Sequence, residues 1–142
     1  YMPEVIEEIK AKIPDVTFVP IKGMTVAQVK ETLLSSKVYL DFGFFPGPEK
    51  LVKEAALCGC NIITSDKGAA KNDKDVPIPS DFKFNMETRP YKEIATLTKA
   101  MLENYGEYNK LFRPYVKKVR ELNDNFERDV IAFVDKIKGN TL

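Results

Sequence analysis

The residue types and spacings that could do chemistry surround one glycine-bearing loop. Gly43 and Gly47 bracket a stretch in which the backbone can turn freely or approach a ligand closely. Pro48 fits the first position of a following helix, where its missing N–H costs nothing. Lys50 lies in the first turn of that helix, where a cation and the free backbone N–H groups can meet a phosphate. The loop is therefore a candidate anion site, and the alternative is an ordinary connection that binds nothing.

The elements on either side of this loop are predicted to be a strand and a helix. Residues 38–42 form a short, mostly apolar run that is typical of a buried strand. Gly59 is placed to stop the helix that follows the loop. A loop that opens onto a helix N-terminus, at the carboxyl end of a parallel strand, is a favourable place for an anion. The apolar side of the helix is formed by Leu51, Val52, Ala55 and Ala56.

A second strand and a long loop come next. Residues 61–64 are predicted to form the strand, and Asp66 and Gly68 follow it closely. Because the carboxyl ends of parallel strands share one edge of a sheet, we expect Asp66 and Gly68 to lie beside the first loop. The loop over residues 65–81 is long, and loops of this length in compact domains are usually functional or mobile. The alternatives are a simple Asp–Gly turn and a plain surface loop.

The remaining elements continue an alternation of helices and strands. A helix is predicted over residues 3–13, a strand over 16–21 and a final short strand over 82–84. Thr25 is predicted to cap a further helix, with Gln28 completing a capping box. The order α-β-α-β-α-β argues for a parallel sheet with right-handed crossovers. The apolar face of the capped helix is expected to bury Val26, Val29, Leu33 and Leu34.

The C-terminal part of the chain is predicted to be helical over residues 90–139. A first helix is expected to end at Tyr105. A second apolar stripe recurs at steps of three or four residues from Leu111 to Ile137, which predicts a long amphipathic helix that starts or kinks near Pro114. The commoner meaning of such a stripe is packing along its own domain, and a coiled-coil or dimer seam is the alternative.

The composition is that of an ordinary globular domain. The chain has 142 residues, of which 44% are hydrophobic and 30% are charged, enough for one domain with a core. A net charge of +1 gives no strong field that would attract nucleic acid or a membrane. No apolar run approaches the length of a membrane span, and no secretory signal is recognisable, so we expect a cytoplasmic protein. Because the chain begins with Tyr1 rather than Met, we expect it to be a fragment or a trimmed form of a longer protein.

Cysteine and histidine usage narrows the possible chemistry. Cys58 and Cys60 are too close for an unstrained disulfide, and two thiols alone make a poor metal site. We expect two small buried residues in a reducing compartment. The chain contains no histidine, which removes the commonest general base and the commonest transition-metal ligand. Acid–base chemistry within this chain must therefore use carboxylates, Lys, Tyr or Cys.

Three of these stretches, residues 42–43, 46–50 and 53–60, together resemble the nucleotide-sugar-binding C-terminal half of GT-B glycosyltransferases. More narrowly, they resemble a bacterial group, seen near surface-polysaccharide genes, that carries the run D-x-G-x-x-P-G-x-[DE]-[KR]-x-x-[KR]-E-A-A-x-x-G-C. Residues 64–70 and 75–79 look like the same group. The resemblance covers about residues 18–84.

The resemblance implies an α/β fold, a Rossmann-like three-layer parallel sheet with helices on both faces and a long C-terminal helical segment. Residues 1–142 would form a single domain, with its first strand missing before residue 1. It also implies that Glu54 accepts ribose hydroxyl groups of a nucleotide, because a carboxylate accepts two donors at once. The alternative for Glu54 is a solvated helix residue paired with Lys50. Gly43 and Gly47 would allow close approach to sugar or phosphate, and Glu49 would favour the helix dipole.

The sequence departs from the usual retaining pattern at one position. Pro46 stands where that pattern has a second Glu, which holds hydroxyl groups of the donor sugar. Asp41 or Glu49 could take its place. Neither the catalytic residue nor the stereochemical outcome follows from the sequence.

The resemblance also leads us to expect a function for the parent protein. The parent enzyme would transfer a sugar from a nucleotide-diphosphate sugar to a cell-surface glycan. It would use a missing N-terminal acceptor-binding domain, and no cofactor or metal beyond the nucleotide sugar as substrate. Nucleic acid and a membrane span are not expected. The alternatives are a GT-B-like sugar-nucleotide epimerase and a flavodoxin-like or receiver-like interaction module.

Overall fold

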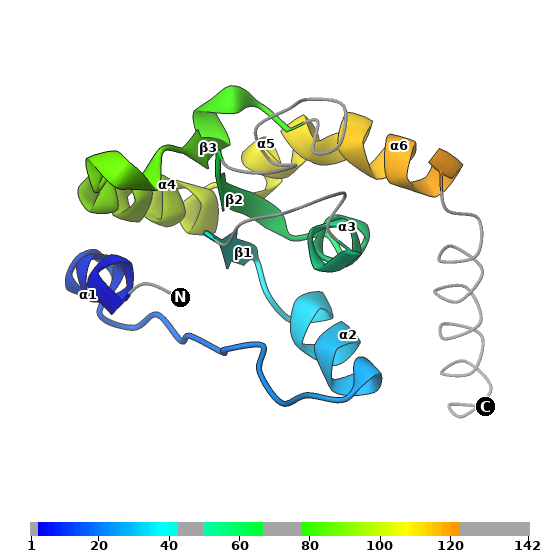
Figure 1. The fold of residues 1–142 in the computed structure, drawn as a ribbon, viewed down its shortest axis with the longest axis horizontal. Coiled ribbons are helices and arrows are strands. Elements are labelled where there is room, and N and C mark those ends of the chain that lie inside the picture. Colours follow the sequence, from blue (N-terminus) through cyan, green and yellow to red (C-terminus); the bar gives the residue numbers. More distant parts are fainter. Residues whose placement is uncertain (1–2, 43–49, 67–77, 123–142) are drawn as a thin grey trace.

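The computed structural model describes residues 3–42, 50–66 and 78–122, and within them the chain folds as a mixed α/β structure (Figure 1). The strands are β1 Val38–Asp41, β2 Asn61–Ser65 and β3 Lys83–Phe84. The α-helices are α1 Pro3–Lys12, α2 Val26–Leu34, α3 Lys50–Leu57, α4 Tyr91–Glu103, α5 Tyr105–Asn109 and α6 Arg113–Leu122. Short 3-10 helices span Ser80–Phe82 (η2), Met86–Thr88 (η3) and Lys110–Phe112 (η4).

The three strands form one parallel sheet in the order β1-β2-β3. The register places Val38 opposite Asn61 and Asp41 opposite Thr64. Every residue of β2 is buried, as expected for a strand that is covered on both faces. The predicted strands at 38–42, 61–64 and 82–84 are therefore confirmed, with small shifts at their ends.

The described apolar side chains form two clusters beside the sheet. In one, α3 and α6 pack with α2 and β2, and its members include Leu33, Val52, Ile62 and Tyr115. In the other, Val5 and Ile9 of α1 pack against Ile94 and Ala95 of α4. Leu40 of β1 contacts both clusters, so the sheet joins them.

Two helix boundaries form as the sequence predicts. The Thr25 N–H donates to Gln28 Oε1 at 2.9 Å, and the Gln28 N–H donates to Thr25 Oγ1 at 3.2 Å, which completes the capping box of α2. At the end of α3, Gly59 has a φ of +89°, and its N–H donates to the Ala56 carbonyl oxygen. The Cys60 N–H donates to the Ala55 carbonyl oxygen, so Gly59 closes α3 in a Schellman motif.

Residues 16–21 do not form the predicted strand. They belong to no helix or strand and have no strand neighbour in the described part of the chain. An isolated strand has no ladder of hydrogen bonds, so the apolar pattern alone does not produce one. Two predicted core positions of α2 are also wrong, since Val26 is 67% exposed and Leu34 is 55% exposed. Only Leu33 of that helix is fully buried, because the narrow face that meets α3 excludes the other two.

The described part of the chain after residue 90 is helical, and the first helix differs slightly from the prediction. The first ends at Glu103, just before the predicted stop at Tyr105, and the short helix α5 follows. The predicted start near Pro114 is confirmed, because α6 begins at Arg113. The part of the predicted helix beyond Leu122 lies outside the described residues. None of the helices that the structure describes is long and apolar enough to cross a membrane.

Candidate functional site

The carboxyl edge of the sheet brings together the first set of candidate residues. Asp41 ends β1, and Asp66 directly follows β2. The register holds these strand ends level, and the Asp66 N–H donates to the Phe84 carbonyl oxygen at 2.9 Å, which ties the end of β2 to β3. The opposite end of α3 leads into the start of β2, so α3 begins on the side of the carboxyl edge. The prediction that Asp66 lies at the carboxyl edge of the sheet is therefore confirmed, while Gly68 and the loop that follows β1 lie outside the described residues.

The carboxylate of Asp41 is oriented by its own strand. The Tyr39 hydroxyl donates to Asp41 Oδ2 at 2.5 Å, and the Tyr39 side chain is buried. A hydrogen bond to a charged acceptor of this length is among the stronger kinds. Residues i and i+2 of a strand share one face, so the spacing of Tyr39 and Asp41 within the predicted strand was sufficient to predict that their side chains are neighbours.

Glu54 lies in the second turn of α3, and its side chain is only 6% exposed. Burial raises the pKa of the Cys58 thiol, the Glu54 carboxylate raises it further, and the Lys30 ammonium opposes this rise. All three side chains are therefore close enough to interact, and Lys30 belongs to α2. The structure contradicts the alternative that Glu54 is a solvated helix residue. Its carboxylate lies inside the protein, on the side of α3 that faces α2.

The other predicted site residues are only partly described. Lys50 is the first residue of α3. Gly43, Gly47, Glu49 and Gly68 lie outside the described residues. The structure thus brings Asp41 and Asp66 to one edge and gives Glu54 a buried position, while the loop that would complete the site remains a prediction.

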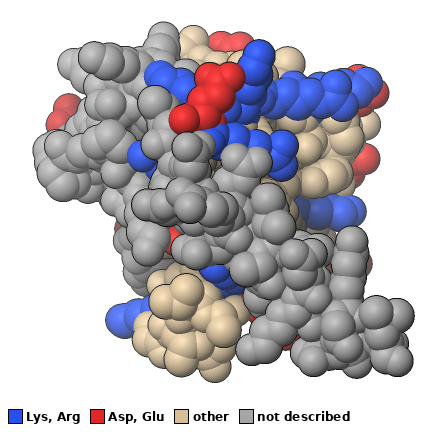
Figure 2. Space-filling model, turned by 90° about the vertical axis from the view of Figure 1, so that its right-hand side faces the viewer, with Lys and Arg blue, Asp and Glu red and all other residues tan. Residues whose placement is uncertain are grey.

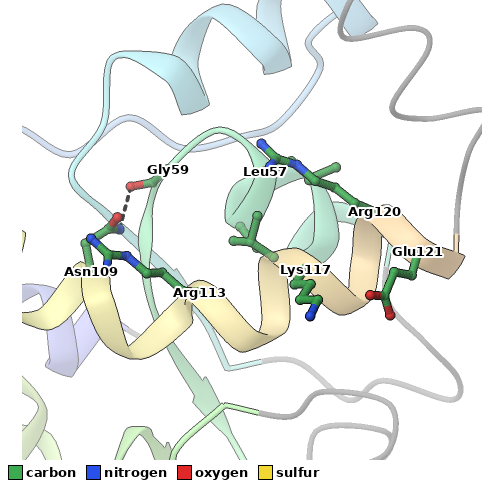
Figure 3. A pocket seen from close by; sticks show the side chains of 9 residues that line it. Leu57, Gly59, Asn109, Arg113, Lys117, Arg120 and Glu121 are labelled. Carbon is green, nitrogen blue, oxygen red and sulfur yellow. Dashed lines mark hydrogen bonds between the residues drawn. The ribbon is translucent and has the colours of Figure 1, made fainter.

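A second polar region lies at the opposite end of β2, in a groove of about 580 Å³ between α3 and α6 (Figure 3). Arg113, Lys117 and Arg120 contribute to its lining. Arg120 extends toward Leu57 at the end of α3, whereas Lys117 and Glu121 point to the other side of α6 (Figure 3). Figure 2 shows Lys and Arg side chains gathered on the upper part of this side of the molecule.

A network of hydrogen bonds forms the polar end of this groove. The Asn109 side-chain amide donates to the Gly59 carbonyl oxygen and to Asn61 Oδ1, both at 2.9 Å. The Tyr105 hydroxyl also donates to the Gly59 carbonyl oxygen at 2.5 Å, and the Asn61 amide donates to the Tyr105 carbonyl oxygen at 3.3 Å. The arginines beside it complement the partial negative charge at the C-terminus of α3. These groups therefore stabilise the junction of α3, β2 and α5.

Among the residues that the structure describes, neither region has a recognisable metal site or a reactive thiol. Within the described ranges, no three Cys, Asp or Glu side chains are grouped as the ligands of a metal ion would be. Cys58 and Cys60 are both free, and burial raises the pKa of Cys60 to about 12. A thiol with such a pKa is almost entirely protonated near neutral pH and is a poor nucleophile.

The arrangement at the carboxyl edge can accept hydroxyl donors through Asp41, and α3 begins beside it. Comparisons of the chain with protein-family models, with curated proteins and with solved structures found no match.

Proposed function

We propose that this chain is the donor-binding half of a GT-B glycosyltransferase and binds a nucleotide-diphosphate sugar at the carboxyl edge of its sheet. The observation that carries the proposal is the arrangement of β1, α3 and β2. The two strands are parallel and level, and α3 begins at the edge where both strands end. In open α/β sheets, ligands bind in the crevice outside the carboxyl ends of the strands.

Each candidate residue has a chemical part in this proposal. The diphosphate meets the first turn of α3, where free N–H groups and Lys50 favour negative charge. The resemblance assigns Glu54, in the next turn, to the ribose hydroxyl groups, and this role requires the ligand to reach a carboxylate that is 6% exposed. Asp41, whose carboxylate accepts a hydrogen bond from the Tyr39 hydroxyl, is the residue that we place at the donor sugar, in the role of the Glu that Pro46 replaces.

The wider architecture is part of the same proposal. The three described strands belong to a larger Rossmann-like three-layer sheet, and the acceptor-binding domain is supplied by another part of the parent enzyme. That enzyme transfers the sugar to a cell-surface glycan.

Nucleotide titration followed by NMR tests the proposal. UDP, GDP, ADP and CMP are titrated into the full chain, and amide shifts are followed at Asp41, Ser65, Asp66 and the start of α3. We expect one nucleoside diphosphate to bind saturably and to move these resonances. Failure of all four nucleotides to move them at millimolar concentration would contradict the proposal.

A matched pair of variants locates the site. Glu54→Gln keeps the size of the side chain but removes the charge, and we expect it to weaken binding about tenfold, or about 1.4 kcal/mol. Glu31→Gln changes an exposed carboxylate on α2 and should leave binding unchanged. Urea unfolding of both variants establishes that each is folded under the conditions of the titration. Equal binding by wild type and Glu54→Gln would remove Glu54 from the site.

A further inference from the structure

Two arginines of α6 line the groove between α3 and α6 at different points along its length. Arg113 and Arg120 are seven residues apart, which is two helical turns, so they lie on one face of α6 and about 10 Å apart along its axis. Both are exposed. Arg113 extends toward Asn109, whereas Arg120 extends toward Leu57 (Figure 3). The groove therefore has a positive charge toward each end.

Neither guanidinium group is engaged by the protein itself. Within residues 3–42, 50–66 and 78–122, no ion pair or hydrogen bond involves the side chain of Arg113 or Arg120. By contrast, the neighbouring Lys110 ammonium lies 3.2 Å from Glu107 Oε1. A guanidinium group carries five N–H donors in a fixed planar fork. The donors of both arginines are therefore available to a ligand in the groove.

The C-terminus of α3 does not need these donors. Its Ala56 carbonyl oxygen accepts from the Gly59 N–H within the turn that closes the helix. The Gly59 carbonyl oxygen accepts from the side chains of Tyr105 and Asn109. The arginines complement the helix end through their charge, and their N–H groups are not used in capping it.

The lining between the two arginines is apolar. It includes Ala56 and Leu57 of α3 and Val116 of α6. Val116 is three residues after Arg113 and four before Arg120, so it shares their face of the helix. A single small anion would meet one arginine and leave this apolar stretch uncovered. The lining thus favours an extended ligand with two separate negative charges and an apolar group between them.

We propose that this groove docks an amphipathic α-helix of a partner protein, with two acidic residues seven positions apart and an apolar residue midway between them. Carboxylates two turns apart on a helix repeat the spacing of Arg113 and Arg120. Each carboxylate forms a bidentate pair with one guanidinium group, and the apolar side chain packs on Leu57 and Val116. The groove lies at the opposite end of β2 from Asp66, so this inference is independent of the proposed sugar-nucleotide site.

Peptide titration into the full chain, followed by NMR, tests the proposal. The probe is an alanine-based helical peptide of about 16 residues, with two glutamates seven positions apart, two leucines midway and lysines on the opposite face. The matched peptide exchanges the glutamates and lysines, so composition and net charge are unchanged. We expect the first peptide to move the amide resonances of Leu57, Arg113 and Arg120 saturably, and the second to bind at least about tenfold more weakly. Equal binding of the two peptides, or no shift at millimolar concentration, would overturn the proposal.

Three variants of α6 locate the contact. Arg113→Gln and Arg120→Gln should each weaken binding of the first peptide about tenfold, because each removes one charge-assisted pair. Lys117→Gln is the matched control, since Lys117 is a cation of the same helix that points to its other side (Figure 3). It should change the affinity less than about twofold. Urea unfolding establishes that all three variants are folded. Equal losses in the three variants would indicate a diffuse attraction to positive charge and would contradict docking.

Two other occupants are distinguished in the same spectra. Sodium pyrophosphate is titrated at constant ionic strength, and complete displacement of the peptide by an equal concentration of pyrophosphate would assign the groove to a small anion. Raising the concentration of the chain without peptide tests for a second copy. Saturable shifts at Leu57, Arg113 and Arg120 in that series would assign the groove to self-association. Either result would overturn the docking of a partner helix.

Discussion

The side-chain amide of Asn109 lies 2.9 Å from the Oδ1 atom of Asn61, across a sequence separation of 48 residues. Asn61 is fully buried at the start of β2, and Asn109 ends α5. The same Asn109 amide reaches the Gly59 carbonyl oxygen, so one side chain satisfies acceptors on both sides of Cys60. The contact is therefore a structural link between the α3–β2 turn and the C-terminal helices.

Asn109→Ala should destabilise the protein by about 1–3 kcal/mol, because it leaves a buried acceptor on Asn61 without this donor. Urea unfolding monitored by circular dichroism measures the change. Asn104→Ala is the control, since Asn104 is exposed and makes no side-chain cap bond to α5. We expect the control to change stability by less than about 0.5 kcal/mol. Equal effects of the two substitutions would argue against the network.

Gly59 and Gly106 should respond oppositely to alanine. Gly59 has a φ of +89°, and an added Cβ would lie 3.3 Å from the Tyr105 hydroxyl oxygen. We expect Gly59→Ala to cost about 1–2 kcal/mol of the free energy of unfolding. A Cβ on Gly106 meets nothing within 4 Å, and this residue lies in α5, so Gly106→Ala should be neutral or stabilising by up to about 1 kcal/mol. Thermal or urea unfolding compares them, and a tolerated alanine at position 59 would contradict the Schellman geometry.

Removal of the capping box should weaken α2. Thr25→Ala removes the acceptor of the Gln28 N–H and should lower the free energy of unfolding by about 1 kcal/mol. Thr96→Ala is the matched control, because Thr96 is exposed within α4 and its hydroxyl bonds only the carbonyl of the preceding turn. Alanine has the higher helix propensity, so this control should be neutral or slightly stabilising. Chemical denaturation of both variants checks the contrast.

The two cysteines should differ in reactivity toward a thiol reagent. The Cys60 thiol is fully buried, its pKa is raised to about 12, and it contacts the Leu33 carbonyl oxygen at 3.2 Å. Cys58 is half-buried, and its pKa is raised by burial and by Glu54. In native protein at pH 8, iodoacetamide should modify Cys58 slowly and leave Cys60 unmodified, as mass spectrometry of the digested protein would show. Faster labelling of Cys60 would be inconsistent with its burial.

Stability should fall in alkaline solution because of Cys60. Its pKa rises on folding from an ordinary value of 9.0 to about 12, so the folded state keeps a proton that the unfolded state loses in this range. The stabilisation is complete below about pH 9 and is lost toward pH 12, with a slope of at most about 1.4 kcal/mol per pH unit. Urea unfolding of wild type and Cys60→Ala from pH 8 to pH 11 isolates this contribution. Parallel curves for the two proteins would refute it.

The elements between residues 38 and 66 were predictable because local signals mark their boundaries. Gly59 ends α3 through its own backbone conformation. The apolar run of β2 predicts a strand without reference to the neighbouring strands. Residues 16–21 carry an equally strong strand pattern, yet a strand also requires a partner, which the local sequence does not specify. Val26 similarly satisfies a helical period but lies outside the face that α2 buries.

The candidate site was predictable to the extent that topology positions it. Parallel strands had to bring Asp41 and Asp66 to one edge, and they do. Burial of Glu54 depends on the side of α3 that faces α2, which helical periodicity alone does not select. The contact between Asn61 and Tyr105 joins residues 44 positions apart, and no local pattern relates them.

The packing of α1 on α4 has a consequence for synthesis on the ribosome. Val5 and Ile9 meet Ile94 and Ala95 only after α4 has been made. At about 5–20 residues per second, the roughly 85 residues between Ile9 and Ile94 take about 4–17 s to translate. During that interval the apolar face of α1 lacks its contact with α4. The nascent chain should therefore be a substrate for ribosome-associated chaperones until α4 emerges.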